Sequence, residues 1–231
     1  MNYEQKFERY RKLGGQLGLM IPKTVFTIKV ENPDGSVIEH KSISRSWTRN
    51  AYNWMLTQLG GVSASSAAQW GNTYLSFKDT TPSIRSGSEA TIYGPGSVSY
   101  GYQAIADNDD WGIVCGTGVI AEEFDDYALG TKIVHGNDPT ELSYNACGYT
   151  KAWDGGTLEM QNTFERIFNN NSGGQIDIGE IGIYAALAIY YTPSAANSTV
   201  MVIRDLVSPV VEVVDTAQMT VTYDIILTYP E

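Results

Sequence analysis

The chain has few charged side chains, and basic residues are the scarcer kind. Charged residues make up 18% of the 231 residues, and 15 Lys and Arg stand against 26 Asp and Glu, for a net charge of −11. Nucleic-acid affinity comes mainly from neutralised phosphates, so this balance argues against direct nucleic-acid binding and equally against an anionic membrane. A surface rich in Ser, Thr, Asn and Gly suits a protein covered by neighbouring proteins.

Cysteine and histidine are scarce too, with two of each in the chain. Cys115 and Cys147 form no C-x-x-C pair, and no Cys and His residues have the spacing of a metal site. We therefore expect no metal and no other cofactor, and two buried thiols in a reducing cytosol. A disulfide between the two cysteines stays an alternative, because spacing alone does not decide it.

The common motifs of hydrolytic enzymes are missing. There is no G-x-S-x-G turn and no H-E-x-x-H motif, and His40 and His135 fall in a polar strand and a turn. We therefore expect no enzyme and no catalytic residue. A hydrolase with two close carboxylates in a cleft stays an alternative. The acidic residues available for it are Glu122, Asp126, Asp154, Glu159 and Glu180.

Long apolar segments are missing as well. The longest apolar run, residues 181–191, is shorter than the roughly 20 residues that span a bilayer, and it contains Gly182. The N-terminal sequence MNYEQKFERYRKLGG lacks the apolar region of a signal peptide. We expect a chain that is made and folded in the cytoplasm, without a membrane partner.

The N-terminal segment shows a short helical pattern. Tyr3, Phe7 and Tyr10 recur at the spacing of one helix face over residues 3–13, before Gly14 and Gly15. A helix this short is marginally stable alone in water. We predict that residues 1–20 form an arm that docks on a neighbouring subunit, with Tyr3, Phe7 and Tyr10 at the interface. The alternative is that the helix folds back on its own domain.

A second helix is predicted over residues 46–59, with Ser46 as its cap and Gly60-Gly61 as its end. Its apolar face comprises Trp47, Ala51, Trp54, Met55 and Leu59. Periodic tryptophans of this kind are more often core anchors than stacking platforms for a ligand.

Strand patterns dominate the rest of the chain. Residues 24–30 alternate, and a turn at 32–35 leads to a partner strand, which predicts a hairpin. Residues 61–110 suggest short strands and long loops. Further strands are predicted at 112–115, 157–168, 175–184, 199–206, 210–214 and 218–228. Many strands and few helices predict a mainly β chain, a β-sandwich of jelly-roll or Ig-like type. We expect one such domain over residues 21–231, with one short buried helix.

One motif suggests a nucleotide site. Residues 116–121, GTGVIA, fit the G-x-G-x-x-A pattern of dinucleotide-binding loops. That pattern binds phosphate at the start of a helix within a βαβ unit. Four acidic residues follow at 122–126, and no βαβ alternation surrounds the motif, so we expect no nucleotide. We expect a strand-end turn and then a short helical turn, capped by Asp125 or Asp126 and ended by Gly130. Its inward-facing residues would be Phe124, Tyr127 and Leu129.

A second acidic segment resembles a calcium loop. Residues 107–112, DNDDWG, look like the start of an EF-hand, but Trp111 and Gly118 stand where oxygen ligands are needed. An irregular calcium loop stays an alternative to a solvated acidic turn. Further along, Glu180 and Arg204 fall on neighbouring predicted strands, where they form either a cross-strand pair or two separate solvated charges.

Three segments in order resemble one group of proteins. They are WGIVCGTGVIAEEFDDYALGTKI (111–133), IDIGEIGIY (176–184) and VIRDLVSPVVEVVDTAQMTVTYDIILTYP (202–230). Together they resemble virion proteins of tailed bacteriophages, over about residues 112–230. RSWTRNAYNWMLTQL (45–59) is similar to a segment near the start of such proteins. The acidic AEEFDD and Cys115 depart from the usual small residues.

The resemblance implies a non-enzymatic structural component of a virion, made in the host cytoplasm. It would assemble with other virion proteins and with copies of itself into a symmetric oligomer, in the tail, neck or baseplate. Low charge and abundant Tyr and Asn suit broad protein contacts. The alternatives are a carbohydrate- or receptor-binding module, with Trp70, Trp111 or Trp153 as stacking residues, and a capsid decoration or head-fibre protein.

Overall fold

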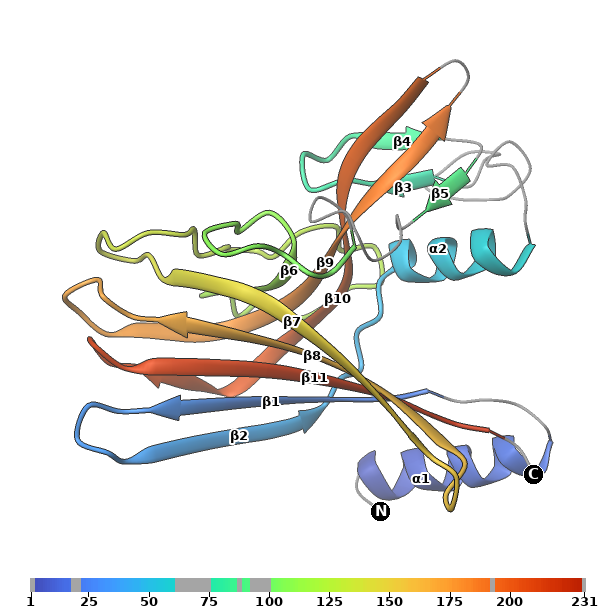
Figure 1. Cartoon of the computed structure of the whole chain (residues 1–231), viewed down its shortest axis with the longest axis horizontal. Helices are drawn as coiled ribbons and strands as arrows, with labels where there is room; N and C mark the ends of the chain where they lie inside the picture. Colours follow the sequence, from blue (N-terminus) through green and yellow to red (C-terminus); the bar gives the residue numbers. More distant parts are fainter. Residues whose placement is uncertain are drawn as a thin grey trace.

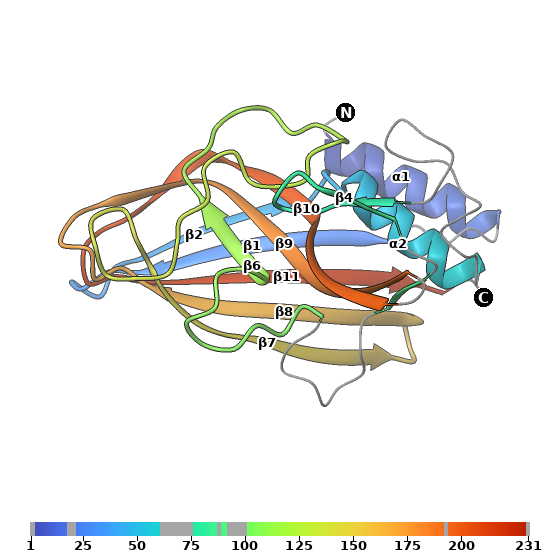
Figure 2. The same ribbon diagram turned by 90° about the horizontal axis from the view of Figure 1, so that it is seen from above.

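The computed structural model describes residues 3–17, 22–60, 76–86, 89–91, 101–191 and 194–229. The described residues are mainly β, and far more of them lie in strands than in helices. The described part contains two helices, α1 and α2, which lie at the same end of the molecule in both views (Figures 1 and 2). The prediction of a mainly β chain is confirmed.

The larger sheet has five antiparallel strands in the order β2-β1-β11-β8-β7. Their bounds are Lys23–Glu31 for β1, Val37–Ile43 for β2, Ser143–Asp154 for β7, Glu159–Asn169 for β8 and Gln218–Thr228 for β11. Alternation sets the register, because β1 buries Phe26 and Ile28 opposite Tyr223 and Val221 of β11. The hairpin predicted from residue 24 onward is therefore present as β1 and β2.

The second sheet is built around β9 (Ile176–Tyr191). Its neighbours are β10 (Ser194–Val213) on one side, and β6 (Gly112–Gly116) and β5 (Glu89–Thr91) on the other. Two short strands, β3 (Ser76–Lys78) and β4 (Ile84–Ser86), pair separately. Figure 1 shows β9 and β10 running obliquely across the five-stranded sheet. The strands predicted at 199–206 and 210–214 are one strand, β10, with a register shift between Leu206 and Val211.

The two sheets share one hydrophobic core. Ile181 and Ile183 of β9 belong to it together with Phe26 and Val221 of the larger sheet. Side chains alternate along a strand, so Glu180 and Gly182, which alternate with Ile181 and Ile183, face the opposite side of β9. That side carries the candidate functional site.

The predicted second helix is shorter than expected. Helix α2 runs from Arg49 to Gly60, and Ser46 is not its cap, because the chain before it runs along β10. The backbone N–H of Arg204 donates to the Ser46 carbonyl at 3.1 Å, and Trp47 forms a bridge with Ile203. Within α2, Ala51 is buried and Trp54 packs against the core, whereas the Leu59 side chain lies outside the described part.

Strand β7 was missed by the sequence patterns. Beyond Cys147 nearly every residue of it is exposed, so no alternation of apolar and polar residues marks it. It forms because its backbone pairs with β8 from Ser143 to Asp154. An edge strand held by its backbone leaves little trace in the order of its side chains.

Helix α1 (Tyr3–Gln16) continues three residues past the predicted end and includes Gly14. Two ion pairs join the N-terminal region to the larger sheet. Arg11 lies 3.0 Å from Glu159 of β8, and Lys23 of β1 lies 3.0 Å from Glu8. Of the predicted interface residues, Tyr10 is 61% exposed and Phe7 is half-buried, while the Tyr3 side chain lies outside the described part. Docking of this helix on a neighbour stays a prediction.

Candidate functional site

Glu180 is the centre of a buried polar cluster on β9. Its side chain has no exposed surface, and its carboxylate accepts three backbone N–H groups. Gly118 donates to Oε1 at 3.2 Å, Thr131 donates to Oε1 at 2.8 Å, and Gly130 donates to Oε2 at 3.1 Å. Backbone N–H groups that converge on one point form an anion site. Here the anion is a carboxylate of the same chain.

This geometry explains the glycines of the G-T-G motif. A Cβ on Gly116 would lie 2.8 Å from Glu180 Oε1, and one on Gly118 would overlap the Glu180 carboxylate itself. Glycine is therefore needed for close approach between the motif and β9. The motif shares with dinucleotide loops the use of bare backbone amides, but Glu180 occupies the position that a phosphate would need.

Arg204 of β10 completes the cluster. Its Nε lies 2.9 Å from Glu180 Oε2, and its Nη1 lies 2.6 Å from Asp126 Oδ2. Its Nη2 donates to the carbonyl of Ile120 at 2.9 Å. Burial lowers the pKa of Arg204, but the hydrogen bonds and charges of Asp126 and Glu180 outweigh burial and raise it overall. Of the two alternatives that the sequence left open for Glu180 and Arg204, the structure contains the cross-strand pair.

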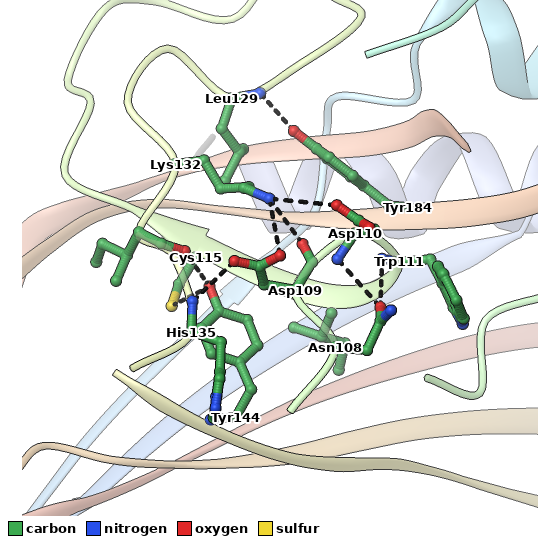
Figure 3. A network of polar contacts seen from close by, with 12 residues as sticks. Asn108, Asp109, Asp110, Trp111, Cys115, Leu129, Lys132, His135, Tyr144 and Tyr184 are labelled. Atoms are coloured by element: carbon green, nitrogen blue, oxygen red, sulfur yellow. Dashed lines mark hydrogen bonds and ion pairs between the residues drawn. The ribbon is translucent and has the colours of Figure 1, made fainter. Parts of the chain in front are cut away.

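Two further contacts fasten the segment 117–131, which we call the latched loop. Glu122 accepts the backbone N–H of Leu206 at 2.9 Å. The hydroxyl of Tyr184 accepts the backbone N–H of Leu129 at 2.7 Å, as Figure 3 shows. The loop is thus held by side chains of β9 and by β10, and its own backbone supplies most of the donors and acceptors.

The latched loop presents apolar side chains outward. Ile120 is 74% exposed, Val119 67% and Phe124 50%. The ring of Phe124 lies 5.6 Å from that of Tyr52 on α2. The expected helical turn running to Leu129 is absent. Instead, residues 123–126 form a hydrogen-bonded turn, in which the Asp126 N–H donates to the Glu123 carbonyl at 3.0 Å and the Asp126 carboxylate accepts the Glu123 N–H. Of the residues expected to face inward, Leu129 is buried, Tyr127 is half-buried and Phe124 is exposed.

A second network ties the acidic segment 107–112 to the chain that follows the latched loop (Figure 3). Lys132 lies 3.3 Å from Asp109, whose other oxygen accepts the backbone N–H of His135 at 2.8 Å. Asp107 lies 3.5 Å from His135 Nε2. Asp109 is thus engaged by donors, and no three metal-binding side chains gather anywhere in the described residues.

Arg166 of β8 is a buried cation that the sequence patterns did not reveal. Each of its five N–H groups donates to a backbone carbonyl, and no carboxylate pairs with it among the described residues. The carbonyls belong to Ile105, Asn108, Trp111, Ile113 and Asn145. Burial lowers the pKa of Arg166. We call this arrangement the carbonyl cage.

The remaining predicted residues are distributed as follows. Cys115 and Cys147 are buried free thiols, as expected, and burial raises the pKa of Cys115 to about 12. Trp111 packs against the core, Trp153 is 55% exposed with its ring 5.3 Å from that of Tyr229, and Trp70 lies outside the described residues. The described helices include none long and apolar enough to cross a membrane.

A scan against protein-family models, a search of curated proteins and a search of solved structures each gave no match.

Proposed function

We propose that the chain is a non-enzymatic structural protein of a tailed-bacteriophage virion, folded as a β-sandwich of jelly-roll or Ig-like type. It works as part of a symmetric oligomer in the tail, neck or baseplate. Its partners are copies of itself and other virion proteins.

The observation that carries this proposal is the meeting of the three resembling segments in one cluster. Gly118 comes from the first segment, Glu180 from the second and Arg204 from the third, and all three are joined by hydrogen bonds. Residues that depend on one another physically form one structural feature. The three resembling segments therefore meet in one structural feature, the latched loop and the side chains that hold it, and are not three unrelated short matches.

The exposed apolar side chains of the latched loop add support. A loop held by buried charges, yet exposing Val119, Ile120 and Phe124, is suited to contact another protein, because large apolar groups gathered on a surface commonly mark interfaces. The low overall charge agrees with extensive contacts between proteins.

Mass spectrometry of gradient-purified particles tests the proposal. Particles produced from the genome that encodes this chain should contain it in amounts comparable to other structural proteins, and cross-linking should place it next to them. If the chain is missing from particles in which the capsid and tail proteins are detected, the proposal is wrong. Capsid-protein cross-links alone would favour the decoration or head-fibre alternative.

A carbohydrate-binding role is the second candidate. The exposed Trp153 ring beside Tyr229 favours it, because flat aromatic rings stack on sugars. Glycan-array binding that is lost in Trp153→Ala, but kept in Phe124→Ala, would support this role over a purely structural one.

A further inference from the structure

The surface of the latched loop combines apolar and acidic side chains. Val119, Ile120 and Phe124 are exposed, and Glu123 beside them is exposed as well. Asp125 adds a second carboxylate, which lies 2.6 Å from Arg49. A partner for this surface would offer an apolar floor and a basic rim.

The chain itself carries a groove of that kind, on the larger sheet. It is lined by the apolar Val25, Ile43 and Ile226 and by the basic Lys23, Lys41 and Arg45. We call it the basic groove. Lys23 is already paired with Glu8 at 3.0 Å, so Lys41 is the basic residue chosen for the test below. Asp224 also lines it, but the Asp224 carboxylate accepts hydrogen bonds from Gln161 and Thr163 at 2.8 and 2.6 Å.

The two surfaces lie on opposite faces of the molecule. Val25 alternates with Phe26, which points into the core, so the groove is on the face of the larger sheet turned away from the core. The latched loop covers the face of β9 that carries Glu180, on the other side of the core. Figure 1 shows β1 and β2 at the bottom and the loops around β6 above them. One copy therefore cannot fill its own groove with its own loop.

We propose that the latched loop of one copy docks into the basic groove of a second copy, head to tail. The inference rests on the proposed oligomer and names the contact that builds it. Such a heterologous contact generates a closed ring or a stack of copies, as the rotation between them dictates.

The latch makes the loop suited to this contact. Arg204, Glu180 and Tyr184 hold its backbone before any partner arrives, so docking needs little further ordering of the chain. The acidic rim of the loop meets the basic rim of the groove, and this complementarity sets the orientation of the two copies.

Charge reversals in the full-length chain test the proposal by sedimentation velocity over a range of concentrations. Wild type should associate, and Lys41→Glu and Glu123→Lys should each weaken association about tenfold or more. An equimolar mixture of the two variants should associate more strongly than either variant alone, and so should the double variant. Lys151→Glu and Glu212→Lys change the charge equally at exposed positions outside both surfaces and should behave like wild type.

The outcomes separate this inference from the proposed function. If wild type associates and both reversals associate equally well, another surface builds the oligomer, and the docking proposal is overturned while the structural role stands. If Glu123→Lys weakens association but the double variant does not recover, the loop contacts something other than the groove. A wild type that stays monomeric also overturns the docking, and the particle experiment then decides the function.

Discussion

Each of the two sheets contains a buried arginine, and the two arginines have different kinds of hydrogen-bond acceptor. Arg166 of β8 donates only to backbone carbonyls, whereas Arg204 of β10 pairs with the carboxylates of Glu180 and Asp126. Their pKa values move in opposite directions. Burial lowers that of Arg166, while in Arg204 the two carboxylates outweigh burial and raise it.

The difference shows what each cluster does for the chain. The carbonyl cage joins the segment 105–113 to β7 and β8 through the Arg166 guanidinium. All of its acceptors are backbone carbonyls, and none is a carboxylate. The cluster at Arg204 joins two carboxylates to backbone groups of the latched loop and so fastens a loop with an exposed apolar surface. The first is a fixed part of the core, and the second positions a surface that we propose to be an interface.

Arg166→Met should have the largest effect on stability. The substitution removes the donors of five backbone carbonyls, one of them fully buried and four partly buried. Each acceptor left unsatisfied away from water costs about 1–3 kcal/mol. Removing a buried charge returns part of this, so we expect the free energy of unfolding to fall by about 4 kcal/mol. Urea denaturation followed by tryptophan fluorescence measures it.

Arg166→Lys is the matched control, since it keeps the charge but has three donors for five carbonyls. It should lose less than Arg166→Met. A methionine variant within about 1 kcal/mol of wild type would mean that water replaces the guanidinium and that the cage is not a stabilising element.

Glu180→Ala should have the next largest effect. It leaves Arg204 with one carboxylate and three backbone N–H groups without an acceptor, and breaking a buried pair in this way costs about 3 kcal/mol. The vacated site is an anion site, so formate should bind there and recover part of the drop in the unfolding midpoint of Glu180→Ala. Sodium chloride at the same ionic strength should restore less.

The same formate series on wild type is the comparison that matters. Formate should not stabilise wild type, because Glu180 already fills the site. Equal stabilisation of both proteins would indicate a general salt effect and would contradict the description of the three backbone amides as an anion site.

Asp205→Asn tests how a buried carboxylate affects the pH dependence of stability. Asp205 follows Arg204 on β10, and its side chain points to the opposite face of that strand. Burial raises the pKa of Asp205 to about 6, although hydrogen bonds from the Arg45 backbone and the Tyr223 hydroxyl lower it, and the charge of Glu122 raises it further. The native state therefore binds this proton more tightly than the unfolded chain. Its contribution to stability is full below about pH 4 and is lost as the pH rises to about 6.

Asparagine removes this titration while keeping partners for Arg45 and Tyr223. We expect a gain on the order of 2 kcal/mol at pH 7 and a flatter stability profile between pH 4 and 6. Unfolding midpoints measured across that window decide it. An unchanged slope would show that Asp205 is not responsible for the pH dependence.

Sequence patterns found the elements whose side chains alternate, such as β1 and β11, and the pair of Glu180 and Arg204. They missed β7 because its exposed residues show no alternation. They missed the carbonyl cage for a deeper reason. Carbonyl oxygens are the same in every residue, so nothing in the identities of Ile105 or Trp111 signals that Arg166 is near.

Phe124→Ser should have the smallest effect on stability. It tests whether the loop held by Arg204 is an interface, which is the proposed difference between the cluster at Arg204 and the carbonyl cage. The ring is half exposed and contacts Tyr52 at the surface, so its loss should change the free energy of unfolding by no more than about 0.5 kcal/mol. If the latched loop is an interface, the same change should still weaken association in sedimentation velocity. A variant that is both less stable by more than 1 kcal/mol and unchanged in association would make Phe124 part of the fold. The cluster at Arg204 would then serve the core, as the carbonyl cage does, and the loop would lose its distinct role.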